Sequence, residues 1–338
     1  MTRHSPLVAA AAQASCTALT ATNPSTFWYE TITHDGISPF IANGASWTVF
    51  RNVKTGYGAK GDGVTDDTAA IVNAIKAGNS AGDRSQHVFG TTGQPAVVYL
   101  PAGTYLISSP LQLYVDTVIM GNPLNPPTIK ASSSFSGSTL IYGKDPNLGS
   151  TINFYIGIKN LILDSTNIAA STTFTLLDWS VSQATQLANV VFNMPDYSTG
   201  HTGIAMPEGG SGTIMNDLTI NGGVVGINFS NQQYNLKGIS FTGCTTGIKV
   251  SGCFDCVFQD LSFDYNSVAI DMTAGGLGSI IVLDSTASNV GTFVATDAES
   301  TGANSLVIEN FSAGSGVTYV SVLFSKNTVY FLTCRYRL

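Results

Sequence analysis

A repeat of about 22 residues is the feature of this sequence that most restricts its fold. The segments TGIAM, VGINF, TGIKV and VAIDM place isoleucines at spacings of 23, 21 and 22 residues, at Ile204, Ile227, Ile248 and Ile270. A second series, apolar-x-apolar after a polar residue, begins at Leu161, Val190, Leu218, Ile239, Leu261 and Ile281. Each segment alternates apolar and polar residues, which is the period of a β-strand.

Two or three short strands in each repeat favour a parallel β-helix over other repeat folds. Leucine-rich repeats need a leucine ladder, and a propeller blade needs about twice this length. In a parallel β-helix each coil adds one strand to each sheet, about 4.8 Å from the next, and the inward apolar residues stack into one core. We therefore predict an all-β fold, with residues 96–113 as the first coil and strand structure persisting through 321–332.

The segment YGAKGDGVTDDT at 57–68 predicts a tight loop that leads into a helix. Thr65 or Asp67 can cap this helix, which we expect at 68–77 as a cap on the first coil and its unpaired strand edge. A phosphate loop is excluded, because GxxxxGK[ST] is absent and the acidic residues repel phosphate. We assign residues 1–46 to an N-terminal arm and 47–338 to the β-helix.

Composition and charge restrict the partners of the chain. With 43% hydrophobic but only 10% charged residues and 35 glycines, the composition is typical of a β-rich secreted protein. The net charge of −7 argues against nucleic acid and anionic membranes, whereas a neutral polysaccharide meets no electrostatic objection. No metal or other cofactor is predicted. Polygalacturonase and lyase chemistry is disfavoured too, because RIK is absent and no arginine lies between Arg84 and Arg335.

The five cysteines indicate buried thiols or one or two disulfides. Cys253 and Cys256 form a single CxxC without a second pair or spaced histidines, so a zinc site is not predicted. Sequons at Asn228 and Asn310 favour an extracellular location, and residues 7–14 are interpreted as at most a remnant of a signal peptide. No apolar run reaches the roughly 18 residues that span a membrane.

Several ordered motifs resemble one known family. FWYETITHDGISPF (27–40), WTVFRNVKTGYGAKGDGVTDDTAAI (47–71), WSVSQATQLANVVF (179–192), PEGGSGTIMNDLTINGG (207–223) and FSNQQYNLKGISF (229–241) resemble fungal glycoside hydrolase family 55, of the pectate-lyase-like superfamily. The resemblance implies a single-stranded right-handed parallel β-helix. It further implies an inverting β-1,3-glucanase built from two tandem β-helices, with the active site in the crevice between them.

The resemblance also implies a site. It assigns the positioning of the attacking water to Gln183 and Ser211, because an amide oxygen and a hydroxyl can accept the protons of the water. Neither is a strong base, so a relay or a carboxylate must take up the proton. The loop PEGGSGT has Gly209 where the family has asparagine. Without the resemblance, Gln183 and Ser211 are ordinary turn residues.

Candidate substrate-binding residues follow from their positions in loops. Glu208 lies in a glycine-rich break after a strand, as part of a cleft or as a solvated loop acid. Asn231, Gln232 and Gln233 could line a sugar cleft or form an amide ladder at a turn. Trp28, Trp47 and Trp179 could stack on sugar rings, although packing is the more common role of such residues.

The general acid of the family is a glutamate of the second β-helix, for which the chain offers no counterpart. We therefore expect the chain to be inactive alone or to need a second β-helix domain or chain as partner. Two alternatives remain: a non-catalytic polysaccharide-binding or tailspike-like structural β-helix, and another polysaccharide-degrading enzyme of the same superfamily.

Overall fold

The computed structural model describes residues 26–39, 41, 44–78, 84–86, 93–212, 214–274, 277–296, 305–325 and 328–332. The chain divides into two compact units, Met1–Ile32 and Thr33–Leu338. The first contains a 3-10 turn, Trp28–Glu30. The second contains every strand described, while the arm boundary predicted at residue 46 stays a prediction.

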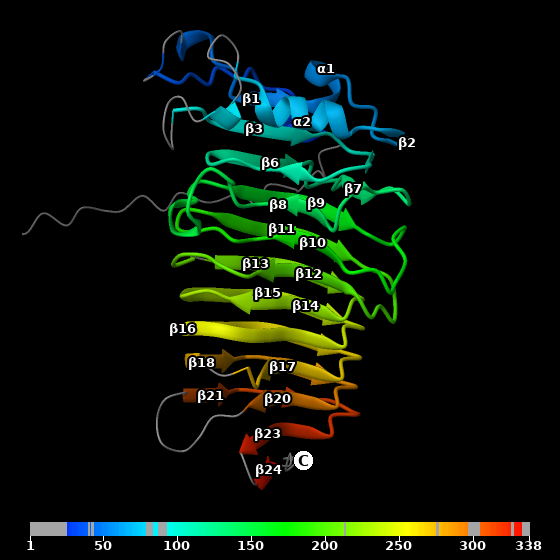
Figure 1. The fold of residues 1–338 in the computed structure, drawn as a ribbon, viewed down its shortest axis with the longest axis vertical. Helices are drawn as coiled ribbons and strands as arrows, with labels where there is room; N and C mark the ends of the chain where they lie inside the picture. The colour runs from blue at the N-terminus through cyan, green and yellow to red at the C-terminus, as the bar shows by residue number, and fades with distance from the viewer. Residues whose placement is uncertain are drawn as a thin grey trace, which may run out of the picture. The chain divides into compact units, whose positions relative to one another are not determined.

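The strands form parallel sheets whose members follow one another in coil order (Figure 1). The long sheet comprises β1 (Phe50–Asn52), β3 (Ala96–Leu100), β6 (Thr117–Gly121), β9 (Gly157–Asp164), β11 (Gln186–Asn193), β13 (Ile214–Asn221), β15 (Gln233–Thr242), β16 (Thr246–Asp264), β18 (Leu277–Leu283) and β21 (Ser305–Glu309). Beyond the bend, the sheet continues as a second row of strands. In the middle coils the long strands β9, β11, β13, β15 and β16 run through both rows. In the other coils the second row has strands of its own: β2 (Asp62–Asp66), β4 (Thr104–Ile107), β7 (Thr128–Ala131), β19 (Thr286–Ser288) and β22 (Ser312–Ala313).

The short sheet closes each coil. It comprises β5 (Leu111–Gln112), β8 (Thr139–Tyr142), β10 (Phe174–Asp178), β12 (His201–Met206), β14 (Val225–Ser230), the first residues of β16, β17 (Val268–Met272), β20 (Thr292–Thr296), β23 (Tyr319–Ser325) and β24 (Thr328–Leu332). All its pairs are parallel except β23–β24, which is antiparallel. The predicted parallel β-helix is thus confirmed, and the predicted strand structure at 321–332 consists of two antiparallel strands, β23 and β24.

The first repeat series stacks as the spacing predicts. Ile204, Ile227, Ile248 and Ile270 pair with one another in successive coils of the short sheet. All four side chains are fully buried. In the preceding coil, Leu177 pairs with Ile204 and extends the same line of residues. These residues form one continuous inner wall, because each coil repeats the in-and-out alternation of the coil before it.

The second series stacks as well, with one error in the predicted register. Leu161, Val190, Leu218, Ile239 and Leu261 pair in order along the long sheet. Ile281, however, pairs with Val257, so the alignment of Ile281 with Leu261 was wrong. Ile280 and Val282 are the buried residues of that strand. Leu261 N donates instead to Ser285 Oγ at 3.3 Å, so the predicted position was four residues too early.

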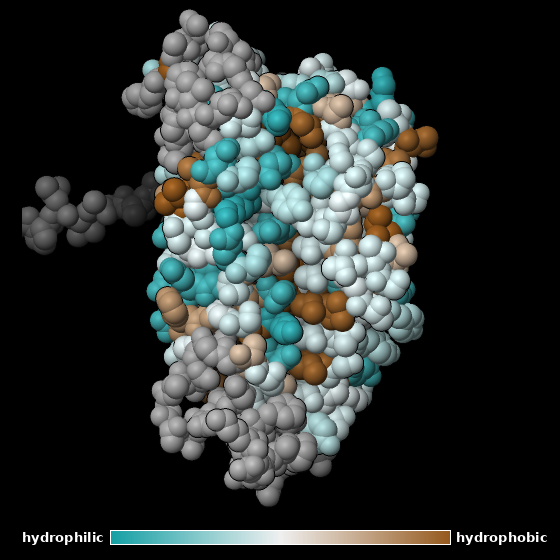
Figure 2. Space-filling model, viewed as in Figure 1, coloured by the Kyte–Doolittle hydropathy of each residue, from teal (hydrophilic) through white to brown (hydrophobic). Residues whose placement is uncertain are grey.

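A second periodic feature lies at the bend within the long strands. Asn160, Asn189, Asp217, Gly238 and Asp260 all have positive φ, at successive positions of the stack. Asn and Asp tolerate this conformation better than other side chains. Asn189 Nδ2 also donates to Asn160 Oδ1 at 2.9 Å, so an amide ladder begins here. Figure 2 shows a broken stripe of hydrophilic residues that runs along the stack on the face drawn there.

The start of the stack is fixed by the acidic loop at 57–68. The α1 helix (Val53–Tyr57) precedes it and the α2 helix (Thr68–Lys76) follows it, one residue shorter than predicted. Asp67 lies at the N-cap but binds the loop instead, accepting from Lys60 N at 2.6 Å and Gly61 N at 2.8 Å. Asp66 Oδ1 accepts from Thr68 N at 3.0 Å in its place. The loop is therefore held by its own carboxylates.

The α2 helix buries one face in the core of the first strands. Ile71, Ala74 and Ile75 are fully buried there, and Figure 1 shows α2 at the β1 end of the stack. Its role as a cap remains a prediction. The prediction that 96–113 forms the first coil was wrong, because β1 and β2 already pair with β3 and β4. The loop motif itself supplies β2, which its glycines concealed.

The cysteines follow the disulfide interpretation. Cys253 and Cys256 are joined by a disulfide, and Cys244 is a buried free thiol whose pKa burial raises to about 12. Cys16, Cys334 and residues 7–14 lie outside the described residues. Within the described part of the chain, no helix is long and apolar enough to cross a membrane.

Asp116 makes the stability of this fold depend on pH. Burial raises the pKa of its carboxyl to about 6, although the positive charge of Arg84 opposes the shift. The folded state therefore binds this proton more tightly than the unfolded state, so the contribution is complete below about pH 4 and is lost as the pH rises through about 6. We expect a loss on the order of 1–2 kcal/mol over this window.

Urea unfolding at pH 4, 5, 6 and 7 measures this contribution. Asp116→Asn should flatten the decrease in the free energy of unfolding between pH 4 and 6. The exposed Asp260→Asn is the control and should keep it. Equal pH profiles for wild type and Asp116→Asn would contradict the assignment.

Candidate active site

Three successive turns from the short sheet to the long sheet carry the predicted site residues. Gln183 follows β10, Ser211 follows β12, and Gln232 follows β14. Each lies three residues before a residue of the next long strand, and those strand residues, Gln186, Ile214 and Asn235, pair with one another. The register therefore places the three residues in one line, which we call the polar column.

The polar column is linked by a direct contact. Ser211 Oγ donates to Gln232 Oε1 at 3.0 Å. Gln183 lies one coil away on the other side of Ser211, by the pairing of Gln186 with Ile214. The structure thus brings together residues that are up to 49 positions apart in the sequence.

Gln183 is exposed, but hydrogen bonds of its neighbours Ser182 and Thr185 hold its turn in place. The buried Ser182 donates to Thr151 O at 3.0 Å and also contacts Gln183 Oε1. Thr185 Oγ1 donates to Ser182 O at 2.6 Å. The amide oxygen of Gln183 keeps a second lone pair for a ligand or a water. This anchoring was not predicted, since serine and threonine are common in any turn.

Glu208 is exposed and forms an ion pair with Lys144, which lies in the loop between β8 and β9. The hydrogen bond from the Lys144 ammonium is the main cause that holds the pKa of Glu208 below its ordinary value. Glu208 is therefore ionised near neutral pH and can accept hydrogen bonds, but it does not act as a proton donor. The ion pair also joins two coil corners.

Asp178, which the sequence interpretation missed, ends β10 five residues before Gln183. Burial is the main cause that raises its pKa, while Ser180, whose Oγ donates to Asp178 Oδ1 at 2.6 Å, lowers it. The charge of Glu208 adds to the increase. A half-buried carboxylate with a raised pKa can take up a proton, which the polar column cannot do alone. In the sequence it is an acid next to Trp179 at the end of an apolar segment, a pattern that does not by itself mark a functional residue.

Asn231 and Gln233 differ from Gln232 in their surroundings. Asn231 is buried, with 7% of its surface exposed; its Oδ1 accepts from Gln232 N at 2.7 Å, and its Nδ2 has no hydrogen-bond partner. Gln233 is exposed and lines a groove. Amide-to-amide hydrogen bonds between coils occur instead at Asn160 with Asn189 and at Asn193 with Asn221, so the ladder interpretation of 231–233 has no support here. A direct contact of the three residues with sugar stays a prediction.

Close neighbours leave no room for a side chain at the glycines of PEGGSG. A Cβ on Gly212 would lie 1.7 Å from the Tyr234 ring, and one on Gly210 would lie 2.2 Å from Ser182 Oγ. At Gly209, a Cβ would lie 2.3 Å from Asn231 Nδ2. Gly209 and the buried Asn231 therefore form a matched pair in this chain.

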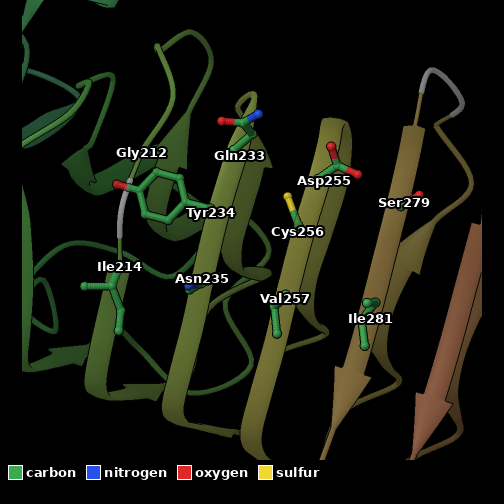
Figure 3. Close-up of a pocket in the computed structure, with 10 residues that line it drawn as sticks. All are labelled: Gly212, Ile214, Gln233, Tyr234, Asn235, Asp255, Cys256, Val257, Ser279 and Ile281. Atoms are coloured by element: carbon green, nitrogen blue, oxygen red, sulfur yellow. The ribbon is translucent and has the colours of Figure 1, made fainter.

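A groove of about 690 Å³ begins beside the polar column and crosses four coils of the long sheet (Figure 3). Its floor is formed by outward residues that stack in register, Ile214, Asn235, Val257 and Ile281. Gln233 and Asp255 stand at its edge near the turns. An open groove with apolar floor and polar edge suits a sugar chain, whose rings have apolar faces and hydroxyl rims.

Burial separates the tryptophans that pack in the core from the one that is exposed. Trp47 and Trp179 are buried, so they are packing residues and do not stack on sugar. Trp28 is 62% exposed. Phe254, also 62% exposed, lies in the sequence between the two bonded cysteines. By the register of β15 with β16, it lies one coil beyond Gln232 in the same line. Among the residues that the structure describes, no group of three His, Cys, Asp or Glu could hold a metal ion.

Fold and site together define a class, the parallel β-helix proteins with polar residues at one corner of the coils. The family described as rhamnogalacturonase A/epimerase, pectate lyase-like, matches residues 50–271, and the chain belongs to this family. The predicted pectate-lyase-like membership is confirmed. This match does not distinguish glycoside hydrolase family 55 from other members of the pectate-lyase-like group.

Two curated fungal relatives and one solved structure extend the comparison. The chain is 40% identical over 276 residues to a probable glucan endo-1,3-beta-glucosidase of Arthroderma benhamiae, covering 78% of this chain and 31% of the relative. It is 37% identical over 306 residues to a glucan 1,3-beta-glucosidase of Cochliobolus carbonum, covering 84% and 38%. The chain therefore spans about a third of the length of these relatives.

The solved structure is the family 28 exopolygalacturonase of Yersinia enterocolitica. It superposes with a TM-score of 0.52 at 14% identity, covering 81% of this chain and 68% of that one. At this identity the likeness concerns the fold alone.

Proposed function

We propose that this chain is one β-helix of an inverting glycoside hydrolase of the family 55 type, which acts on neutral β-1,3-glucan outside the cell. The observation that carries the proposal is the polar column, in which Ser211 Oγ binds Gln232 Oε1 and Gln183 follows in register. The names of the fungal relatives and the net charge of −7, which disfavours polyanions, support it. The exposed sequon residues Asn228 and Asn310 support the location.

In this proposal, the chain positions the attacking water. Gln183 Oε1 and Ser211 Oγ accept hydrogen bonds from the water and direct its lone pair at the anomeric carbon. Asp178 takes up the proton through a relay, and the ionised Glu208 orients a sugar hydroxyl. The carboxylic acid that protonates the leaving oxygen comes from a second β-helix.

A chimera tests this division of labour. We expect the chain alone to bind laminarin without releasing glucose, and a fusion to the remaining part of the Cochliobolus carbonum relative to release it. Gln183→Ala in the fusion should lower kcat about 100-fold, because the water loses its orientation. Gln186→Ala, an exposed glutamine of the next strand, is the control and should change little.

The outcomes separate the candidate functions. Robust glucose release by the isolated chain would overturn the need for a second β-helix. A fusion in which Gln183→Ala turns over at the wild-type rate would overturn the role of the polar column. Laminarin binding without turnover in any form would favour a non-catalytic glucan-binding module.

A further inference from the structure

A second groove lies at the opposite corner of the coils, where the long sheet passes into the short sheet. Its volume is about 740 Å³, slightly more than that of the groove beside the polar column. Its lining residues come from four turns, and Tyr197, Gly243, Thr245, Tyr265 and Asn289 are among them.

Two tyrosines at the edge of this groove are exposed at a conformational cost. Tyr197 is 95% exposed and Tyr265 is 67% exposed. Their φ angles are 53° and 54°, in the left-handed region. Among the described non-glycine residues with positive φ, eight of twelve are Asn or Asp, which adopt it more readily. A bulky aromatic in this conformation gains little burial in return; Tyr155, outside this groove, has φ 57° and is 46% exposed, so it is the position of Tyr197 and Tyr265 at the groove that carries the argument.

The tyrosines are spaced along the stack with an open floor between them. Tyr197 follows β11 and Tyr265 follows β16, three coils further on. At about 4.8 Å for each coil, the turns lie about 14 Å apart along the stack. The short turn at Gly243 lies between them, and a Cβ there would meet nothing within 4 Å. The turn at Gly243 therefore leaves room above it for a ligand.

The floor offers hydrogen-bonding groups with little charge. Asn266 is 3% exposed, its Nδ2 donates to Cys244 O at 2.9 Å, and its Oδ1 has no hydrogen-bond partner. Ser267 and Thr245 add hydroxyls, and Asp196 is the one charged residue in the lining. Aromatic faces beside neutral polar groups match a sugar chain, whose rings offer apolar faces and hydroxyl rims.

We propose that this groove is a second binding site for a neutral polysaccharide, in which the rings of Tyr197 and Tyr265 stack on sugar rings. The exposed hydroxyls of Ser267 and Thr245 then bind the sugar hydroxyls. The choice of β-1,3-glucan as the sugar rests on the proposed function. The site is separate from the polar column, so it would hold the polysaccharide without taking part in bond cleavage.

Isothermal titration of the full chain with laminarin tests the site. Tyr197→Ala combined with Tyr265→Ala should weaken the affinity at least about 10-fold, whereas Tyr197→Phe combined with Tyr265→Phe should retain it, since stacking uses the ring face. Leu124→Ala, at an exposed apolar residue outside both grooves, is the control for folding and should bind as wild type. Polygalacturonate, a polyanion, should bind at least about 10-fold more weakly than laminarin.

The outcomes distinguish this proposal from the proposed function. Equal laminarin affinity of the wild type and the double alanine variant would overturn the second site and leave the polar column untouched. Absence of laminarin binding by the wild type would also overturn it, and glucose release by the fusion would then still decide the proposed function. Loss of affinity only in Gln183→Ala would assign all binding to the first groove.

Discussion

Replacing Trp179 by alanine is expected to lower the free energy of unfolding by about 3–5 kcal/mol, as for other large buried aromatic residues. The side chain is fully buried directly after β10. Its Nε1 donates to Tyr234 Oη at 3.0 Å, and burial raises the pKa of that phenol to about 12. The substitution therefore leaves a cavity and removes the donor from a buried hydroxyl.

Urea denaturation followed by circular dichroism measures the loss. Trp28→Ala is the matched control, since Trp28 is 62% exposed, and it should shift the free energy of unfolding by less than about 0.5 kcal/mol. Trp179→Phe should fall between the two. A smaller effect at Trp179 than at Trp28 would show that the corner beneath the polar column is not held by this side chain.

The second large effect is expected at Arg84, where methionine should lower the free energy of unfolding by about 3 kcal/mol. Arg84 is 2% exposed and its guanidinium joins three segments. It donates to Ile75 O at the end of α2, to Gln94 O, and to Val115 O and Thr117 Oγ1 around the start of β6. Methionine fills similar volume but leaves several of these acceptors unsatisfied.

Arg84→Lys is the informative companion variant. A single ammonium cannot reproduce the planar fork of the guanidinium, so lysine should recover less than half of the lost stability. Hydrogen exchange should locate the damage in α2 and the first coils. If lysine restored full stability, charge alone would be sufficient at this position and the geometric argument would fail.

The stack itself was predictable because its determinants are local and periodic. The isoleucine series at Ile204 to Ile270 gave both the fold class and the register of the short sheet, since each coil repeats the same inward positions. The long sheet was predicted to Leu261 and missed at Ile281. There the repeat is four residues longer than the 20-residue spacing from Leu261 to Ile281, because Leu261 lies opposite Ser285 and Ile281 pairs with Val257.

The site was predictable in part. The resemblance led to Gln183 and Ser211, and the structure adds the contact of Ser211 with Gln232. Sequence reasoning could not find Asp178, because its raised pKa depends on burial and on a charge from another coil. The burial of Asn231 against Gly209 is likewise a property of two neighbouring turns. Such contacts join residues whose local sequence carries no sign of the other.

The turns that carry the polar column differ greatly in length from coil to coil. They hold seven residues after β10, seven after β12 and two after β14; in the flanking coils the same corner holds 14 residues after β8 and none within the continuous β16. The bend within the long strands, by contrast, is a single residue in each of these coils. Insertions at this corner can therefore change ligand preference during evolution while the register of the stack is inherited unchanged.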